Sequence, residues 1–120
     1  ALTIDSSQNA TFAGTVSDSI GELRQIPSRS VSSVTLATSD VGKAILATST
    51  VTVPNSTFSA GDAVTIINNS GSDITISKSI STMYLASDGS SANRTLATRG
   101  MATIWFASGT VAYISGAGLS

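Results

Sequence analysis

The stretch AGDAVTIINNSGSDITIS, residues 60–77, decides the fold class of this chain. Branched apolar residues stand at alternate positions on each side of a central break, Val64 and Ile66 before it and Ile74 and Ile76 after it. A spacing of two is typical of a strand with one buried face, because successive side chains point to opposite sides. The break itself, NNSGS, is rich in turn-forming residues, so it predicts a hairpin that joins two paired strands.

Strand signals of the same kind recur from residue 34 to near the end of the chain. Turn residues interrupt them about every 8–12 residues, which is typical of a β-sandwich or a β-barrel. Residues 41–46 depart from this alternation and are expected to form a single helical turn that leads into a strand. The strands are expected at residues 34–36, 50–53, 64–66, 74–76, 83–85, 94–97, 102–106 and 110–115, with turns at Gly100 and at Ser108-Gly109.

The residues expected to face inward are mostly small and branched, so the predicted sandwich is thin. They are Val34, Leu36, Ile45, Val51, Val53, Val64, Ile66, Ile74, Ile76, Met83, Leu85, Leu96, Ile104, Phe106 and Ile114. Each fully buried side chain of this kind contributes about 1.5–3 kcal/mol, so the predicted core stabilises residues 28–120 only marginally. Since the chain has no cysteine for disulfides, oligomerisation is the expected source of further stability.

Composition favours an all-β class. The 120 residues include 23 serines and 16 threonines but only 13 charged side chains, six basic and seven acidic. Serine competes for helical backbone hydrogen bonds, whereas threonine, valine and isoleucine suit a pleated surface. The net charge of -1, without any basic cluster, excludes the electrostatic footprint of a nucleic-acid-binding protein. The absence of cysteine and histidine removes thiolate and histidine-dependent catalysis and the usual zinc ligands, and no cofactor or metal is expected.

Residues 1–27 are expected to form a stalk and neck, and residues 28–120 a β-sandwich-like head. Two short strands flank the polar turn SSQN near the start, and one hairpin of this size buries too little apolar surface to be stable alone. Copies of the hairpin from neighbouring chains are its expected packing partners. The neck contains GELRQIP, residues 21–27, in which Glu22 and Arg24 lie close together before the proline ends any regular ladder.

The chain begins in mid-pattern without a methionine and is expected to be a fragment of a longer protein. No signal peptide is visible in it. No apolar run approaches the roughly 20 residues needed to cross a bilayer, so membrane insertion is not expected. The few charges and the abundance of serine and threonine suggest an exposed, extracellular environment.

Several short sequence motifs follow one another along nearly the whole chain. Residues 10–16, ATFAGTV, look like the repeating phrase of bacteriophage fibre stalks. Residues 21–45 contain a Leu-Arg-x-Ile-Pro phrase, a strand and an Asp-x-Gly-Lys turn, and residues 60–77, 93–104 and 114–120 continue the same kind of module. Together these phrases resemble the C-terminal domains of bacteriophage tail fibres, and the final ISGAGLS looks like a native C-terminus.

This resemblance implies a location on the virion, as an intertwined parallel homotrimer at the distal tip of a tail fibre, where it recognises the host surface. The implied partner is a host cell-surface glycan or an outer-membrane protein. The expected function is therefore receptor binding during adsorption, and the protein is not expected to be an enzyme. Two rival functions stay open: a structural trimerisation cap that binds no ligand, and a polysaccharide-degrading enzyme of the tailspike type.

Trp105 is the first candidate for receptor contact. It stands between Ile104 and Phe106, which are expected to face the core, so the alternation turns the indole outward. An outward tryptophan offers an apolar platform for a sugar ring. The same position is compatible with the trimer interface, where aromatic residues are enriched, or with ordinary packing.

Two loops, residues 68–73 and 87–93, supply the other candidates. Tyrosine, aspartate, asparagine and arginine side chains in and beside these loops have groups that hydrogen-bond sugar hydroxyls. The candidates are Tyr84, Asp88, Asn93, Arg94, Asn68 and Asn69. Both loops also have a plain interpretation as solvated turns. A glycosidase needs two carboxylates about 5–10 Å apart, and the sequence brings no such pair together.

Overall fold

A computed structural model describes residues 2–21 and 25–120, so the predicted neck contact of Glu22 and Arg24 lies outside the described residues. Strands make up 50% of the structure and helix 3%, which confirms the all-β class. The elements are β1 (Leu2–Ile4), β2 (Ala10–Phe12), β3 (Ser28–Val31), β4 (Val34–Thr35), the 3₁₀ turn η1 (Thr38–Asp40), β5 (Ala44–Ala47), β6 (Val51–Val53), β7 (Ala63–Asn68), β8 (Ile74–Lys78), β9 (Thr82–Leu85), β10 (Arg94–Phe106) and β11 (Val111–Leu119).

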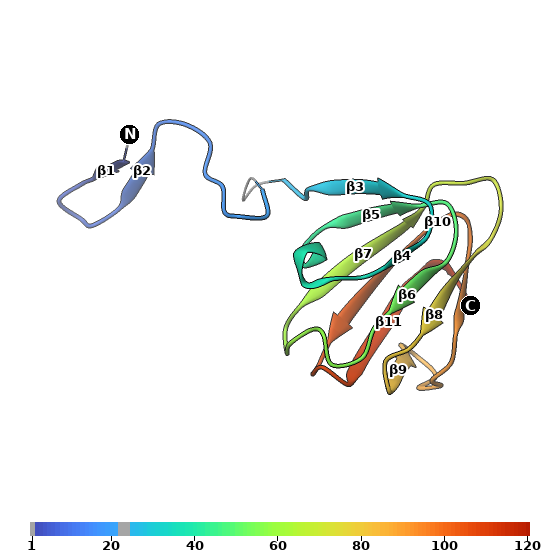
Figure 1. The fold of residues 1–120 in the computed structure, drawn as a ribbon. Coiled ribbons are helices and arrows are strands. Elements are labelled where there is room, and N and C mark those ends of the chain that lie inside the picture. Colours follow the sequence, from blue (N-terminus) through green and yellow to red (C-terminus); the bar gives the residue numbers. More distant parts are fainter. Residues whose placement is uncertain (1, 22–24) are drawn as a thin grey trace.

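The six strands from β3 to β8 wind as three stacked coils (Figure 1). Strands β3, β5 and β7 pair in parallel in one half of the sheet, and β4, β6 and β8 pair in parallel in the other half. The chain therefore crosses between the halves at every connection within a coil. Backbone hydrogen bonds also link the corners of successive coils, from Thr48 and Ser49 to Ser32 and from Asn69 to Ala47.

The hairpin predicted across residues 68–72 is wrong. Strands β7 and β8 do not pair with each other but lie on either side of β10, which is antiparallel to both. The turn between them is the corner of the third coil and carries the chain from one half of the sheet to the other. A turn-rich break between two alternating segments suits a hairpin and a coil corner equally well, so local pattern does not separate the two.

Strand β10 joins the two halves and is one continuous element, not the two strands with a turn at Gly100 that the sequence predicts. Its residues 94–96 pair with β8 and its residues 101–105 pair with β7. Between these pairings the register with β11 shifts and Arg99 adopts a positive φ of 59°. This irregularity bends the strand around the corner, as bulges commonly do.

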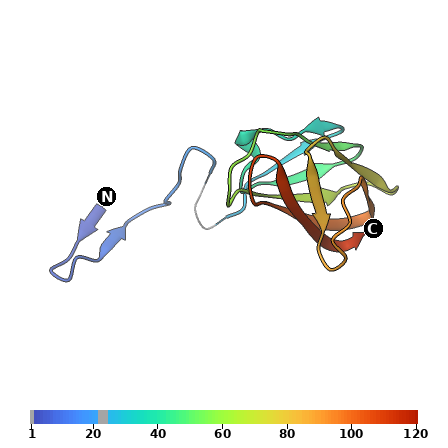
Figure 2. The same cartoon turned by 90° about the horizontal axis from the view of Figure 1, so that it is seen from below.

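The sheet closes almost completely into a barrel (Figures 1 and 2), where the sequence predicts a sandwich-like arrangement. Strand β11 pairs antiparallel with β10 and parallel with β9. The path ends at β3 on one side and at β4 on the other. No helix among the described residues is long and apolar enough to cross a membrane.

The core contains the residues that the sequence predicts to face inward. All of them are buried except Val34 and Leu85, which are partly buried and pack against the core. Phe106 stacks on Phe58, with ring centroids 4.2 Å apart. The buried apolar residues that the strand pattern does not predict are Ala47, Phe58, Ile80, Ala102 and Ala112.

An ion pair joins β3 to the 3₁₀ turn η1, which follows β4. The short helical turn lies at residues 38–40, before the predicted position, and it buries the side chain of Asp40. The Asp40 carboxylate accepts hydrogen bonds from Nε and Nη2 of Arg29 at 2.8 and 3.0 Å, and from the backbone N–H of Ala37 at 2.9 Å. Burial alone raises the pKa of Asp40, but these hydrogen bonds and the charges of Arg29 and Lys43 outweigh it, so the pKa lies below 3.8.

Gly116 gives the first test of this fold. A Cβ at this position would overlap the carbonyl oxygen of Met101 in the neighbouring strand, whereas a Cβ at Gly71 meets no atom within 4 Å. We expect Gly116→Ala to lower the free energy of unfolding by about 2 kcal/mol or more, because the β10–β11 pair must separate. Gly71→Ala is the matched control, with a change within about 0.5 kcal/mol in urea titration. Equal stability of the two variants would contradict the β10–β11 register.

The Arg29–Asp40 pair gives a pH-dependent test. Arg29→Met leaves a buried carboxylate without its cation, and we expect a loss of about 1–3 kcal/mol at pH 7, since Arg29 itself is partly exposed. Because the folded pKa of Asp40 is depressed, its stabilisation is complete above the unfolded pKa and disappears as pH falls through the lower folded value.

The difference in unfolding free energy between wild type and Arg29→Met should therefore shrink as the pH falls from 7 to below the unfolded pKa of Asp40. Urea titrations at several pH values measure it. Arg99→Met, which removes a guanidinium bonded to the exposed Asn69, is the control and should show no such trend. A pH-independent difference for Arg29→Met would contradict the assigned pair.

Candidate ligand-binding surface

Three aromatic side chains stand in a row on the outer face of the barrel. Trp105 of β10 is the register partner of Tyr113 in β11, and Tyr113 is the register partner of Tyr84 in β9. The ring centroids are 6.5 Å apart for Trp105 and Tyr113 and 5.3 Å apart for Tyr113 and Tyr84. Trp105 is 48% exposed and Tyr113 is 45% exposed, so the row presents ring surface to solvent.

The outward direction predicted for Trp105 is confirmed. Its neighbours Ile104 and Phe106 are fully buried, so the alternation along β10 holds through this segment. Tyr113 is a member of the row that the candidate residues omit. The same alternation could have found it, because Ile114 is expected to face inward and Tyr113 precedes it directly.

The outer face continues from the aromatic row along β7 and β10. Thr65 and Thr103 are register partners, and their hydroxyl oxygens lie 3.1 Å apart. Met101 follows at the next outward position of β10 and is 50% exposed. This part of the surface therefore combines rings, hydroxyls and a thioether in a sheet face, which suits a protein partner as well as a small ligand.

A groove borders the aromatic row at Tyr84 and Tyr113. Its volume is about 310 Å³, close to the lower end of the range of roughly 300–1,000 Å³ that is common for ligand sites. The loop that follows β9 contributes to its lining. The groove is lined by Tyr84, Leu85, Ala86, Ser87, Gly89 and Tyr113. It is the place where the predicted candidate Tyr84 and the predicted loop meet.

Hydrogen bonds hold this loop in shape. Oδ1 of Asp88 accepts from the backbone N–H and from the hydroxyl of Ser90, both at 2.7 Å. The hydrogen bond from the backbone N–H has the larger effect and the one from the hydroxyl the next, and both lower the pKa of Asp88 below 3.8. The carboxylate is therefore ionised at neutral pH. Ser87 and Gly89 on either side have positive φ values of 89° and 71°, which is a strained conformation for the serine.

Arg94 bonds to the loop, and Asn93 bonds to the backbone of β8. Arg94 is only 8% exposed, and its Nη2 donates to the carbonyl oxygen and to the hydroxyl of Ser90 at 2.9 and 2.8 Å. Oδ1 of Asn93 accepts from the backbone N–H of Lys78 at 2.8 Å. Both side chains were candidates for receptor contact, and their observed hydrogen bonds are to the protein's own backbone and loop.

Asn68 does not suit the receptor contact predicted for it, because it is fully buried. Its Nδ2 donates to the carbonyl oxygens of Ser72, Leu96 and Ala97 at 2.8–3.0 Å. Its Oδ1 accepts from the backbone N–H and hydroxyl of Ser70. This one amide therefore joins the corner between β7 and β8 to the bend of β10, which explains why the polar side chain is buried.

Asn69 is exposed, and its Oδ1 accepts from Nη1 of Arg99 at 3.0 Å. It follows the end of β7 that pairs with Met101, whereas Trp105 pairs with the other end of β7. The structure therefore does not bring Asn69 together with the aromatic row. It brings together Trp105, Tyr84 and the Asp88 loop.

The aspartates of the predicted turns serve separate local structures. Oδ2 of Asp62 accepts from the backbone N–H of Ser59 at 2.9 Å, and Oδ1 of Asp73 accepts from that of Thr98 at 3.3 Å. Asp40 pairs with Arg29, as described above. Within residues 2–21 and 25–120, no group of three or more acidic, cysteine or histidine side chains is placed to hold a metal ion.

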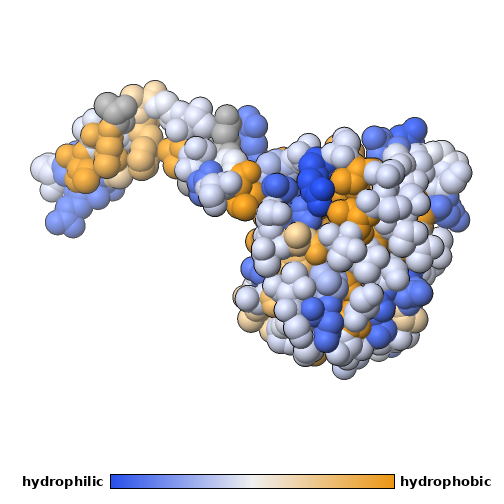
Figure 3. Space-filling view, in the orientation of Figure 1, coloured by the Kyte–Doolittle hydropathy of each residue, from blue (hydrophilic) through white to orange (hydrophobic). Residues whose placement is uncertain are grey.

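A second surface of interest is the apolar face of the β1–β2 hairpin. Leu2 pairs with Phe12, and these residues share a face with Ile4, while Thr3 and its partner Thr11 occupy the other face. Leu2, Ile4 and Phe12 are 58%, 64% and 53% exposed. Figure 3 shows apolar residues gathered on this part of the chain.

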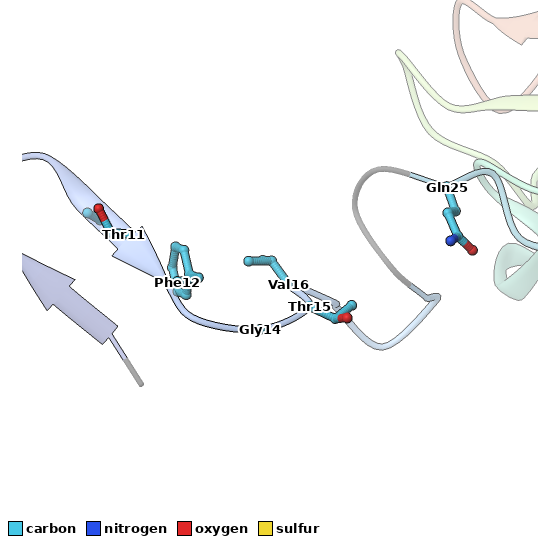
Figure 4. Close-up of a pocket in the computed structure, with 7 residues that line it drawn as sticks. Thr11, Phe12, Gly14, Thr15, Val16 and Gln25 are labelled. Carbon is cyan, nitrogen blue, oxygen red and sulfur yellow. The ribbon is translucent and has the colours of Figure 1, made fainter.

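A hollow of about 550 Å³ lies beside this hairpin, where Phe12 and Val16 point in the same direction (Figure 4). Its lining also includes Thr15 and Gln25. The apolar hairpin face and the hollow together leave an unfilled contact surface in the single chain.

No protein-family model matches this chain, and no curated protein matches it. Its function is therefore inferred from its own residues. The two features with the clearest chemical meaning are the exposed aromatic row with its groove and the uncovered apolar face of the hairpin.

Asn68 generates a stability prediction. Asn68→Ala leaves three backbone carbonyls at the corner without their donor, and we expect the free energy of unfolding to fall by about 2–4 kcal/mol. Asn69→Ala removes one exposed hydrogen bond from the adjacent residue, and we expect a loss below about 1 kcal/mol. Urea titration of the two variants measures the difference. Equal losses would show that the buried amide does not join the corner to β10.

Proposed function

We propose that this chain is the distal, receptor-binding part of a bacteriophage tail fibre, which attaches the virion to the host surface. The motifs of residues 10–16 and 21–45 support the fibre assignment, and the observation that carries receptor binding is the row Trp105–Tyr113–Tyr84, exposed on the sheet and bordered by a groove. Exposed aromatic rings provide large, rigid contact area for a sugar or a protein receptor. The proposed partner is a host cell-surface glycan or an outer-membrane protein.

We propose a homotrimer, with residues 1–27 as the interleaved stalk segment and residues 28–120 as the head. The support is the exposed face of Leu2, Ile4 and Phe12, because a two-stranded hairpin in water needs a packing partner for such a face. Hairpins from two further copies supply the same apolar surface. In that arrangement, the hollow beside Phe12 and Val16 receives side chains of a neighbouring copy.

The proposed mechanism is adsorption through many weak contacts. Three heads on one fibre, and several fibres on one particle, multiply a modest affinity at each site. The small net charge of -1 and the abundance of serine and threonine keep the surface soluble without strong non-specific attraction. Catalysis is not part of the proposal, since the described aspartates serve separate turns and an ion pair.

A structural trimerisation cap is the second candidate, and one observation favours it. The outer face of Met101, Thr103 and Trp105 is exposed and partly apolar, as surfaces that form subunit interfaces often are. If three heads pack through this face, the row is covered and the domain registers the stalk without binding a ligand. The two candidates differ in whether the assembled protein binds cells.

Solution mass and cell binding test these proposals. Light scattering on a sizing column should give about three times 12.0 kDa for the wild type and for Thr3→Asp, which alters the polar hairpin face away from the hollow. Phe12→Asp, on the apolar face, should shift the mass toward 12.0 kDa, because a charge cannot be buried there cheaply. A wild-type monomer contradicts the trimer.

The fluorescently labelled trimer should bind some members of a panel of bacterial cells, and excess unlabelled chain should compete. A stable trimer that binds no cell in a broad panel favours the structural cap. Release of reducing ends from host polysaccharide would instead support the tailspike-type enzyme and contradict the proposed function.

A further inference from the structure

The groove beside the aromatic row has features of a binding site for one kind of ligand. Tyr84 and Tyr113 line it, with ring planes tilted by 43° to each other, and Ala86, Ser87 and Gly89 of the loop after β9 line it as well. The volume of about 310 Å³ suits a ligand of one or two small rings and is too small for a folded segment.

The groove offers both apolar and polar contacts. The tyrosine rings provide faces for C–H groups, and their hydroxyls can donate and accept hydrogen bonds. The loop adds the Ser87 side chain and its own backbone groups. Such a mixture matches a pyranose, which has an apolar face of C–H bonds and a rim of hydroxyls.

The charge at the rim narrows the ligand class further. Within the loop, residues 86–91, Asp88 is the only charged residue in the sequence ASDGSS. Asp88 is exposed and stands between Ser87 and Gly89, which line the groove, although its own side chain does not line it. Its Oδ1 accepts from Ser90. Arg94 lies behind the loop and is nearly buried, so its cation is not presented to an anionic ligand.

The loop is also formed before any ligand arrives. Leu85 and Ser90 are joined by a backbone hydrogen bond of 2.8 Å, and Gly89 donates to Leu85 at 2.9 Å. The hydroxyl of Ser91 accepts from the backbone N–H of Met83 at 3.0 Å. A wall held in this way loses little conformational entropy on binding, which favours affinity for a small ligand.

We propose that the groove between Tyr84, Tyr113 and the Asp88 loop binds a neutral pyranose and disfavours sugars that carry a carboxylate, phosphate or sulfate. This inference rests on the proposed receptor-binding function and assigns to it a site and a ligand class. The ionised carboxylate of Asp88 beside the groove repels anionic sugars. Tyr113 packs against the sugar ring.

The test uses pairs of sugars that differ by one carboxylate, glucose with glucuronic acid and galactose with galacturonic acid. Binding to the full chain is measured by saturation-transfer NMR and by titration with short oligomers of each sugar. We expect the neutral member of at least one pair to bind, and its acidic counterpart to bind about tenfold more weakly or not at all. Preference for the acidic member, or binding of neither neutral sugar, would overturn the proposal.

Two variants locate the binding. Tyr113→Ala should weaken binding of the neutral sugar by about tenfold or more, because a ring face is lost. Asp88→Asn keeps an acceptor for Ser90 but removes the charge, so it should reduce the discrimination between the paired sugars several-fold with little change in unfolding temperature. Asn69→Ala, at the opposite end of β7, is the control and should bind as wild type does. Unchanged binding and discrimination in Tyr113→Ala and Asp88→Asn would overturn the site.

Cell binding separates this inference from the proposed function. If the labelled chain binds cells and Tyr113→Ala binds them equally well, the protein recognises its receptor elsewhere and the groove proposal fails alone. If the groove binds neutral sugars but the chain binds no cell, the site holds and the proposed function fails.

Discussion

The bend in β10 is the constraint on which the rest of the structure depends. One strand serves as antiparallel partner to β7 along one half of its length and to β8 along the other. The two halves of the barrel are therefore joined through a single backbone. Asn68 holds the bend by donating to two carbonyls of β10 and one of the adjacent corner. Burial of this amide costs desolvation free energy, but its hydrogen bonds outweigh that cost. Each buried carbonyl left without a donor would destabilise the folded state.

The candidate surface is a direct product of that arrangement. Strand β11 pairs with the second half of β10, and β9 pairs with β11, so three aromatic residues that are distant in sequence become neighbours. The ring of Tyr113 lies between Trp105 and Tyr84 and contacts both. The loop after β9 then closes the groove, and Arg94 at the start of β10 supports it. Strand β9, the loop that follows it and Tyr113 of β11 therefore together line the proposed sugar site.

Sequence predicts which side of each strand is buried far better than which strands pair. A period of two is a local property, and it correctly places the core and turns Trp105 outward. Pairing depends on residues that are far apart, so the segments around Val64 and Ile76 resemble a hairpin although β10 separates them. For the same reason Asn68 resembles a loop residue, because the three carbonyls that justify its burial lie up to 29 positions away.

The stacked coils have a consequence for how the chain reaches its native state. Parallel partners in successive coils are 16 to 25 positions apart, from Ser28 with Ala44 to Val51 with Ile76, so the coils assemble through fairly short chain closures. Until residues 94–120 are made, however, β7 and β8 expose unpaired backbone along the last coil. A chain that ends early therefore presents two open strand edges, the form most prone to aggregate. Residues 94–106 are therefore needed before the strands of the last coil have partners on both sides.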